Sequence, residues 1–179
     1  MIMTTPTLLN NGQPVTTEAQ LNACIAAANA LAANSGAYAI ILSAAFQGTL
    51  DSPLTQINLA AGVSLDIQGN GAFLDGGGQQ RGLYVNAGTV TIEDLTLYSM
   101  AAIGGSPLVS PGGGGAPGLG GGLYVGARAV VSLDGVNFQN NSARGGTGGV
   151  GDNGNKPGPN GQDGGTNASA SPAAAYGYG

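Results

Sequence analysis

Two stretches of the chain are near copies of each other, and this repeat limits the possible folds more than any other feature. The Gly-Leu-Tyr-Val sequence of residues 82–85 returns at 122–125, and the apolar alternation of residues 90–97 returns at 131–138. The offset is 40 residues for the first block and 41 for the second, so one residue is added between them. Self-similarity at such a period predicts a repeat architecture, in which each unit buries its apolar face against its neighbours.

The repeat is long because it contains a glycine-rich insert at residues 104–121. Without the insert the period falls to about two dozen residues, the length of one coil of three strands and three corners. Glu93-Asp94 and Asp134-Gly135 would form corners, and the apolar side chains between corners would face inward. The inward positions are Val90, Ile92, Leu95 and Leu97 in the first repeat, and Val131, Leu133, Val136 and Phe138 in the second. We therefore expect an all-β fold, a parallel β-helix (solenoid) of stacked coils around an apolar core.

One segment near the start of the chain has helical periodicity. Thr16 or Thr17 is a suitable N-cap, and apolar residues recur at helical spacing from 21 to 32. The helix is expected over roughly residues 16–34. Such an amphipathic helix would close the N-terminal end of the stack, where strand edges and core are otherwise open. The lone cysteine, Cys24, lies on its apolar face and is interpreted as a small buried hydrophobe.

The chain is thus expected to divide into four parts. They are an N-terminal lead-in (1–15), the capping helix with its exit (16–37), β-helix coils interrupted by the glycine-rich insert (38–143), and a Gly/Pro/Asn-rich insert with the truncated start of a further coil (144–179). An α/β sandwich is disfavoured because no second helix alternates with the strands. The final residues, 173–179, are similar to the start of another Gly-Leu-Tyr-Val coil, so we expect a fragment of a longer protein.

The two glycine-rich inserts carry a second period of three residues. Glycines fall at 112, 115, 118 and 121, then at 145, 148, 151 and 154, and after a one-residue slip at 158, 161 and 164. One interpretation is a pair of flexible side loops. The other is extended polyglycine- or polyproline-type strands that pack on each other, or along the side of the solenoid, with hydrogen bonds between strands.

Composition excludes several partners. The chain has 4 Lys+Arg against 9 Asp+Glu, a net charge of −5 and no His. A nucleic acid or an anionic membrane surface requires clustered cations, so neither is an expected partner. No apolar run is long enough to insert into a membrane. The start of the chain lacks a signal peptide, so export would use a non-classical route or a C-terminal signal, or a leader has been removed.

The chain resembles the N-terminal, capped part of bacterial secreted and surface proteins with a right-handed parallel β-helix. Three features carry the resemblance: the helix before the first strand, the sequence Leu-Asp-Ile-Gln-Gly-Asn-Gly at 65–71, and the pattern from Gly-Leu-Tyr-Val to Asn-Asn-Ser-Ala at 122–143. The family comprises autotransporter passengers and adhesins similar to polymorphic membrane proteins. The resemblance implies a right-handed solenoid and an extracellular or cell-surface location, but one such fold serves lyases, adhesins and inert stalks alike.

Candidate catalytic groups are sparse. Hydrolysis of a polysaccharide requires two carboxylates about 5–10 Å apart, and Glu93 and Asp134 would stack on successive coils at about 4.8 Å. A solvated corner pair is the preferred interpretation, because no His and few Arg could serve as base or clamp. The other carboxylates considered are Asp51, Asp66, Asp75 and Asp94. Asn/Asp/Gly turns at 151–155 and 160–164 lack the calcium signature, so no metal, cofactor or catalytic residue is assigned.

Tyr84 and Tyr124 occupy equivalent positions in the two repeats and would stack outward as a ladder. They are the candidate binding residues, for a surface glycan or a protein ligand. The sequence thus favours a non-enzymatic extracellular segment of a bacterial surface protein, adhesive or structural. Two alternatives stay open: the N-terminal part of a carbohydrate-active enzyme with catalytic coils beyond residue 179, and a module that self-associates through its uncapped C-terminal coil.

Overall fold

The fold is one sheet-rich body with a single α-helix. The computed structural model describes residues 5–106 and 115–148. The strands are β1 (Thr7–Leu8), β2 (Gly36–Ile41), β3 (Gln47–Thr49), β4 (Ile57–Asn58), β5 (Val63–Asp75), β6 (Leu83–Tyr98), β7 (Ala101–Ile103), β8 (Leu123–Asp134), β9 (Asn137–Gln139) and β10 (Ser142–Arg144). The helices are α1 (Glu18–Asn29) and a short 3-10 turn at Asn10–Gly12.

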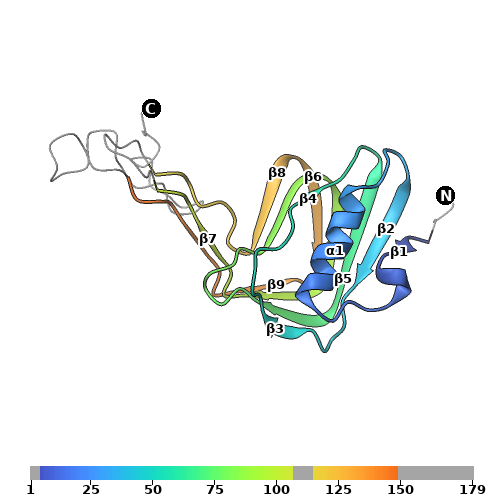
Figure 1. The fold of residues 1–179 in the computed structure, drawn as a ribbon, viewed down its shortest axis with the longest axis horizontal. Helices are drawn as coiled ribbons and strands as arrows, with labels where there is room; N and C mark the ends of the chain where they lie inside the picture. The colour runs from blue at the N-terminus through green and yellow to red at the C-terminus, as the bar shows by residue number, and fades with distance from the viewer. Residues whose placement is uncertain (1–4, 107–114, 149–179) are drawn as a thin grey trace, which may run out of the picture.

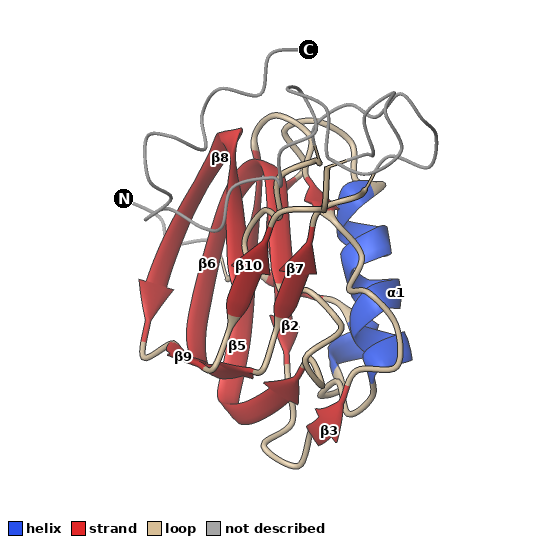
Figure 2. Ribbon diagram, turned by 90° about the vertical axis from the view of Figure 1, so that its left-hand side faces the viewer, coloured by secondary structure: helices blue, strands red, loops and turns tan. Residues whose placement is uncertain are grey.

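The strands pair in parallel throughout the described residues. Eight of them form one sheet whose main path is β1-β2-β5-β6-β4, with β3 joined to β5, and β8 and β9 joined to β6. β7 and β10 form a separate two-stranded sheet. Figure 1 shows the large sheet beside α1, with β7 in a part of the chain that projects away from both. Figure 2 shows α1 running alongside the strands on one side of the molecule.

The sequence repeat corresponds to the pairing of β6 with β8. Leu83, Tyr84 and Val85 lie opposite Leu123, Tyr124 and Val125, and the later partners run from Ala87–Arg128 to Glu93–Asp134. The partner offset changes from 40 to 41 at an irregularity between Val85 and Ala87. The residue added in the second repeat is therefore accommodated as a β-bulge in β8, which lets both blocks of the repeat keep their pairing.

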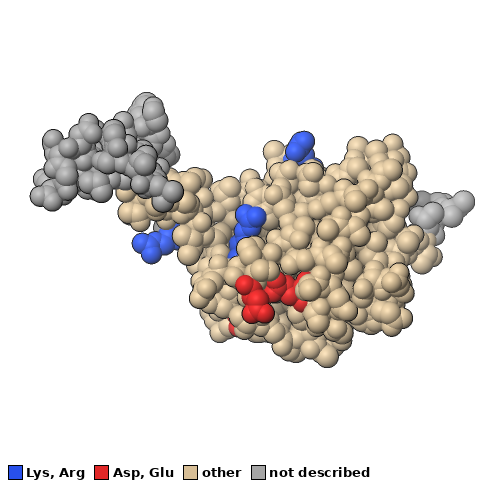
Figure 3. Space-filling model, in the orientation of Figure 1, with Lys and Arg blue, Asp and Glu red and all other residues tan. Residues whose placement is uncertain are grey.

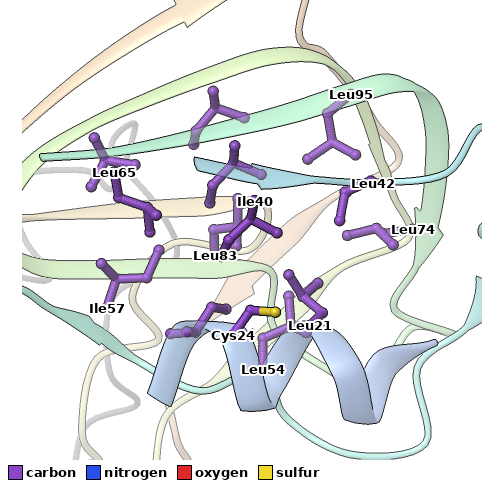
Figure 4. Packing of buried hydrophobic residues seen from close by; sticks show 14 of the residues in the cluster. Leu21, Cys24, Ile40, Leu42, Leu54, Ile57, Leu65, Leu74, Leu83 and Leu95 are labelled. Carbon is purple, nitrogen blue, oxygen red and sulfur yellow. The ribbon is translucent and has the colours of Figure 1, made fainter. Parts of the chain in front are cut away.

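The expected helix is present and packs against the strands. The side-chain oxygen of Thr17 accepts a hydrogen bond from the Gln20 N–H, as an N-cap does. The helix ends at Asn29, with Ala30 as its C-cap, rather than at residue 34. Its apolar residues contribute to the shared core; Figure 4 shows Leu21 and Cys24 projecting from α1 toward the strand residues around Ile40. The helix is thus held by burial of one face against the sheet.

A polar stripe on α1 fixes its position along a neighbouring loop. Glu18, Asn22 and Asn29 lie on one helical face, at spacings of 4 and 7 residues. Their side-chain oxygens accept hydrogen bonds from the backbone N–H groups of Asp51, Thr55 and Asn58 at 2.6, 2.6 and 2.7 Å. Because this loop forms little regular structure, the three side chains supply the partners that its backbone requires.

The solenoid predicted from the repeat is wrong. The structure is mostly a parallel sheet with one helix, the sheet does not close, and no solenoid is found in the described residues. The expected corner at Glu93-Asp94 does not end a strand: β6 continues through it to Tyr98, although Asp94 has a φ of 47°. Alternating apolar residues and parallel pairing are equally satisfied by an open sheet covered on one face, so those patterns could not discriminate between the two folds. Without a stack of coils, the predicted role of the helix as a cap on the end of the stack is also wrong.

The inward positions of the first repeat are confirmed, and those of the second are only partly so. Val90, Ile92, Leu95 and Leu97 are all fully buried, or nearly so. In the second repeat Val131 and Val136 are partly buried, whereas Leu133 and Phe138 are exposed. The difference arises because β8 and β9 have a described neighbour, β6, on one side alone.

The glycine-rich segments pack on each other where they are described. The chain runs outward at 101–105, returns at 115–121 and runs outward again from 142, with hydrogen bonds from Gly104 N–H to Arg144, Ala116 N–H to Gly105 and Gly146 N–H to Ala116. Each is 2.8 Å long. This is the packed-strand interpretation of the three-residue period, confirmed for these segments. The glycines at 112 and 151–164 lie outside the described residues.

Glycine is required in this array because the backbones approach too closely for a side chain. A Cβ added to Gly118 would lie 2.5 Å from the carbonyl oxygen of Ala102 and closer still to that of Arg144, and Gly115, Gly121 and Gly146 are similarly crowded by backbone atoms. The glycines at 115, 118 and 121 thus allow the segment 115–121 to lie directly against the backbone of residues 142–146.

Gly118→Ala should therefore separate the three glycine-rich segments. We expect a loss of about 1–3 kcal/mol of local stability, because the new methyl group meets backbone that must shift. Hydrogen exchange at Gly104 and Gly146 should become at least about tenfold faster. Gly105→Ala is the matched control, since a Cβ there meets nothing within 4 Å. Equal exchange rates in the two variants would contradict the packing.

Cys24 should behave as a core residue with a poorly reactive thiol. Its burial raises the pKa of the thiol above the ordinary value of 9.0 by desolvation. The neutral thiol is favoured in the folded state, so its contribution to stability is constant below pH 9.0 and is lost as the pH rises above it. Wild type should lose more stability than Cys24→Ala between about pH 8 and pH 10. In Ellman's assay at neutral pH, a cysteine introduced by Ala33→Cys at an exposed position should react rapidly and Cys24 slowly; equal rates would contradict this.

Candidate functional site

The tyrosines predicted to stack are in contact. Tyr84 in β6 and Tyr124 in β8 are register partners, and their ring centroids lie 4.4 Å apart at an interplanar angle of 25°. Both side chains are partly exposed. The stack follows from the repeat itself, because parallel strands in register place identical residues side by side on the same face.

Arg81 completes the stack, a role that no sequence motif indicates. Its guanidinium carbon lies 4.5 Å from the centroid of the Tyr84 ring, within cation–π range. Tyr124 and Arg81 both lie within about 4.5 Å of the same centroid, so the Tyr84 ring is contacted by both. Tyr124 is stacked on one face only among the described residues. The outer face of the aromatic pair therefore belongs to Tyr124.

A shallow groove runs beside this stack. Its volume is about 370 Å³, and its walls come from the turn before β6, from β7 and from the returning glycine-rich segment. The lining residues are Pro53, Gln79, Gln80, Arg81, Tyr84, Ala101, Ala102, Ile103, Pro117 and Leu119. Ile103 and Leu119 are exposed large apolar side chains. Amide and guanidinium groups together with aromatic and apolar walls give the groove both hydrogen-bonding and stacking capacity.

A second, larger groove carries less chemistry. Its volume is about 520 Å³, and it lies between the segment 59–64, the start of the β6 irregularity at 87–89, and Arg128. Apart from Arg128, its lining is made of small or aliphatic residues and hydroxyls. Specific recognition requires convergent polar groups, so the groove beside Tyr84 is the better candidate.

The structure brings one pair of the candidate carboxylates together. Glu93 and Asp134 are direct register partners at the ends of the β6–β8 pairing, as the repeat predicts. None of the other candidate carboxylates is a register partner of another, although Figure 3 shows acidic side chains gathered in one patch. Asp75 accepts a hydrogen bond from the Gly77 N–H in a turn, and one carboxylate oxygen of Asp66 accepts from Gln68. Figure 3 shows how few charged side chains this face of the molecule presents.

Asn141 has a structural role in the turn between β9 and β10. Its side-chain oxygen accepts a hydrogen bond from the Met100 N–H at 2.8 Å, and its amide donates to the Leu97 carbonyl at 2.9 Å. The side chain therefore ties the end of β9 to the exit of β6. An asparagine bonded on both sides in this way has its hydrogen-bonding capacity used internally.

Metal and membrane sites were examined in the same residues. Within 5–106 and 115–148, no group of three or more His, Cys, Asp or Glu is arranged to hold a metal ion. No helix in that part of the chain is both long and apolar enough to cross a bilayer. The turns at 151–155 and 160–164, considered above for calcium, and Lys156 lie outside the described residues.

Comparison with known proteins adds no assignment: no protein-family model, no curated protein and no solved structure matches this chain.

The tyrosine stack should contribute measurable coupling energy. In a double-mutant cycle, Tyr84→Ala and Tyr124→Ala should be non-additive by about 0.5–1.5 kcal/mol, measured by denaturant unfolding. Tyr98 is the control: it packs on Phe73 at 5.2 Å, in another aromatic pair. Tyr84→Ala and Tyr98→Ala should add within about 0.5 kcal/mol. Additivity in the first cycle would show that the stack makes no net contribution.

Proposed function

We propose that this chain is a non-enzymatic binding segment of a bacterial surface or secreted protein, with an adhesive or structural role outside the cell. The ligand is a surface glycan that stacks on Tyr124 and extends into the groove beside Tyr84. The observation that carries the proposal is the stack of Arg81, Tyr84 and Tyr124: Arg81 and Tyr84 line the groove, and Tyr124 has one ring face without a described stacking partner.

The chemistry of the stack suits a sugar. The C–H face of a pyranose packs on an aromatic ring, and hydroxyl groups require donors and acceptors nearby. Gln79 and Gln80 supply amides, and Arg81 supplies a guanidinium that is already held in place by the Tyr84 ring. Because the Arg81 guanidinium is preorganised, binding would not have to order this side chain, and the entropic cost of binding is lower.

The geometry favours binding over hydrolysis at this groove. Cleavage of a glycosidic bond requires two carboxyl groups on either side of the bond, at most about 10 Å apart. The described residues that line the groove include no carboxylate. Of the paired carboxylates Glu93 and Asp134, Glu93 is nine residues along β6 from Tyr84, which corresponds to as much as about 30 Å of strand. A sugar bound at the tyrosines would therefore not reach the Glu93–Asp134 pair.

The proposal is tested by binding of the full chain to immobilised polysaccharides. Dextran, chitin and polygalacturonate cover neutral, acetylated and acidic sugars. We expect retention on at least one of them, about tenfold weaker affinity for Tyr124→Ala, and near wild-type affinity for Tyr124→Phe, because the ring makes the contact. Tyr98→Ala, which removes an aromatic from the other pair, should bind as wild type does.

Two outcomes would overturn the proposal. One is the absence of binding to all three polysaccharides. The other is binding that Tyr124→Ala leaves unchanged.

A further inference from the structure

β8 is an edge strand in the part of the chain that the structure describes. Its partners are all on β6, and β9 likewise pairs with β6 alone. The opposite edge of β8 therefore presents backbone N–H and C=O groups without a described strand partner. An edge of this length is a template for further strand pairing unless something covers or blocks it.

Apolar positions that are buried in the first repeat are exposed at the equivalent positions of the second repeat. Val85, Ile92 and Leu97 are each 0 % exposed, whereas their partners Val125, Leu133 and Phe138 are 45, 47 and 42 % exposed. The residue types are similar and the register is shared, and among the described residues β8 and β9 have a strand neighbour on one side alone. A soluble monomer rarely leaves a contiguous apolar row of this kind open, and such rows mark interaction surfaces.

The charges on β8 indicate which neighbour fits. The strand carries one basic residue, Arg128, and one acidic residue, Asp134, placed three residues to either side of Val131. The three positions are separated by odd steps, so Arg128 and Asp134 share one face while Val131, the partner of buried Val90, lies on the apolar face. Neither charged residue has an ion pair among the described residues, and Asp134 lies opposite Glu93, a like charge.

We propose that β8 pairs antiparallel with β8 of a second copy of this chain, about a two-fold axis at Val131. In that register residue 128 of each copy faces residue 134 of the other, so two Arg–Asp pairs form, and each Asp134 gains a cation to offset Glu93. On the apolar face, Val131 meets its own copy and Ala129 meets Leu133. The apolar rows of both molecules are covered by the same contact.

Other arrangements of two copies fit less well. A head-to-tail contact would have to use the opposite edge of the sheet, and there β1 offers two residues, Thr7 and Leu8. A parallel β8–β8 pair in register would place Arg128 against Arg128 and Asp134 against Asp134, which is repulsive. Only the antiparallel arrangement matches opposite charges at both ends of the strand.

Charge reversal tests the register directly. Sedimentation velocity of the full chain over a range of concentrations should show a monomer–dimer equilibrium. Arg128→Asp or Asp134→Arg alone should weaken the dimer by about tenfold or more, since each places two like-charged pairs across the axis. The double variant Arg128→Asp/Asp134→Arg restores opposite charges and should recover an affinity close to that of wild type.

Asp51→Arg is the matched control for the change of charge, because Asp51 lies in the loop beside the N-terminal end of α1 and not on β8. Circular dichroism of each variant establishes that it is folded. A strict monomer at every concentration, a dimer indifferent to the single reversals, or a failure of the double variant to recover would each overturn the proposal. The result is independent of the glycan assay, since the two tests change different residues.

Discussion

The structure depends on β6 being hydrogen-bonded along both of its edges. Val90 is paired with Leu65 of β5 and with Val131 of β8, and a strand residue can have two such partners only if they lie on opposite edges. β4 and β9 join the same strand near its two ends. Every large part of the sheet is therefore attached through β6, and its inward side chains are at most 2 % exposed. Full burial of each such Val, Ile or Leu stabilises the fold by about 1.5–3 kcal/mol.

Much of this local order could be predicted from the sequence, because local patterns reflect local physics. The helix between Thr17 and Ala30, the alternation in β5 and β6 and the pairing of the two repeats all follow from spacing and capping. The closed solenoid could not be derived in the same way. A period-2 pattern specifies which face of a strand is apolar, and it leaves open whether the sheet curls into a stack or stays open with a helix beside it.

Contacts made by single side chains outside the repeat were the least accessible to prediction. Arg81 is one of four basic residues and belongs to no motif, yet it covers one face of Tyr84. Asn22 and Asn29 belong to no motif either, yet their side chains accept hydrogen bonds from the backbone N–H groups of Thr55, before β4, and Asn58, within β4. Hydrogen bonds of this kind leave no periodic signal. They depend on which loop the fold brings within reach of each side chain.

The glycine-rich segments show the opposite case, in which a pattern was visible but compatible with two physical states. A glycine at every third residue suits a flexible loop and also suits backbones packed closely together. The two differ in whether the peptide groups bond to water or to another segment. Around Gly118 the bonds are made between segments, so here the glycines serve close packing.

The bulge divides β8 into two parts, and each part carries one of the two proposed contacts. It lies between Val125 and Arg128, where the partner offset to β6 changes, and a bulge interrupts the regular ladder on both edges of a strand. Tyr124 with its outer ring face lies before the bulge, and the charged, apolar run from Arg128 to Asp134 lies after it. A second copy that pairs with residues 128–134, after the bulge, would therefore not need to contact Tyr124. The residue added in the second repeat thus separates a face suited to a sugar ring from an edge suited to another copy of the chain.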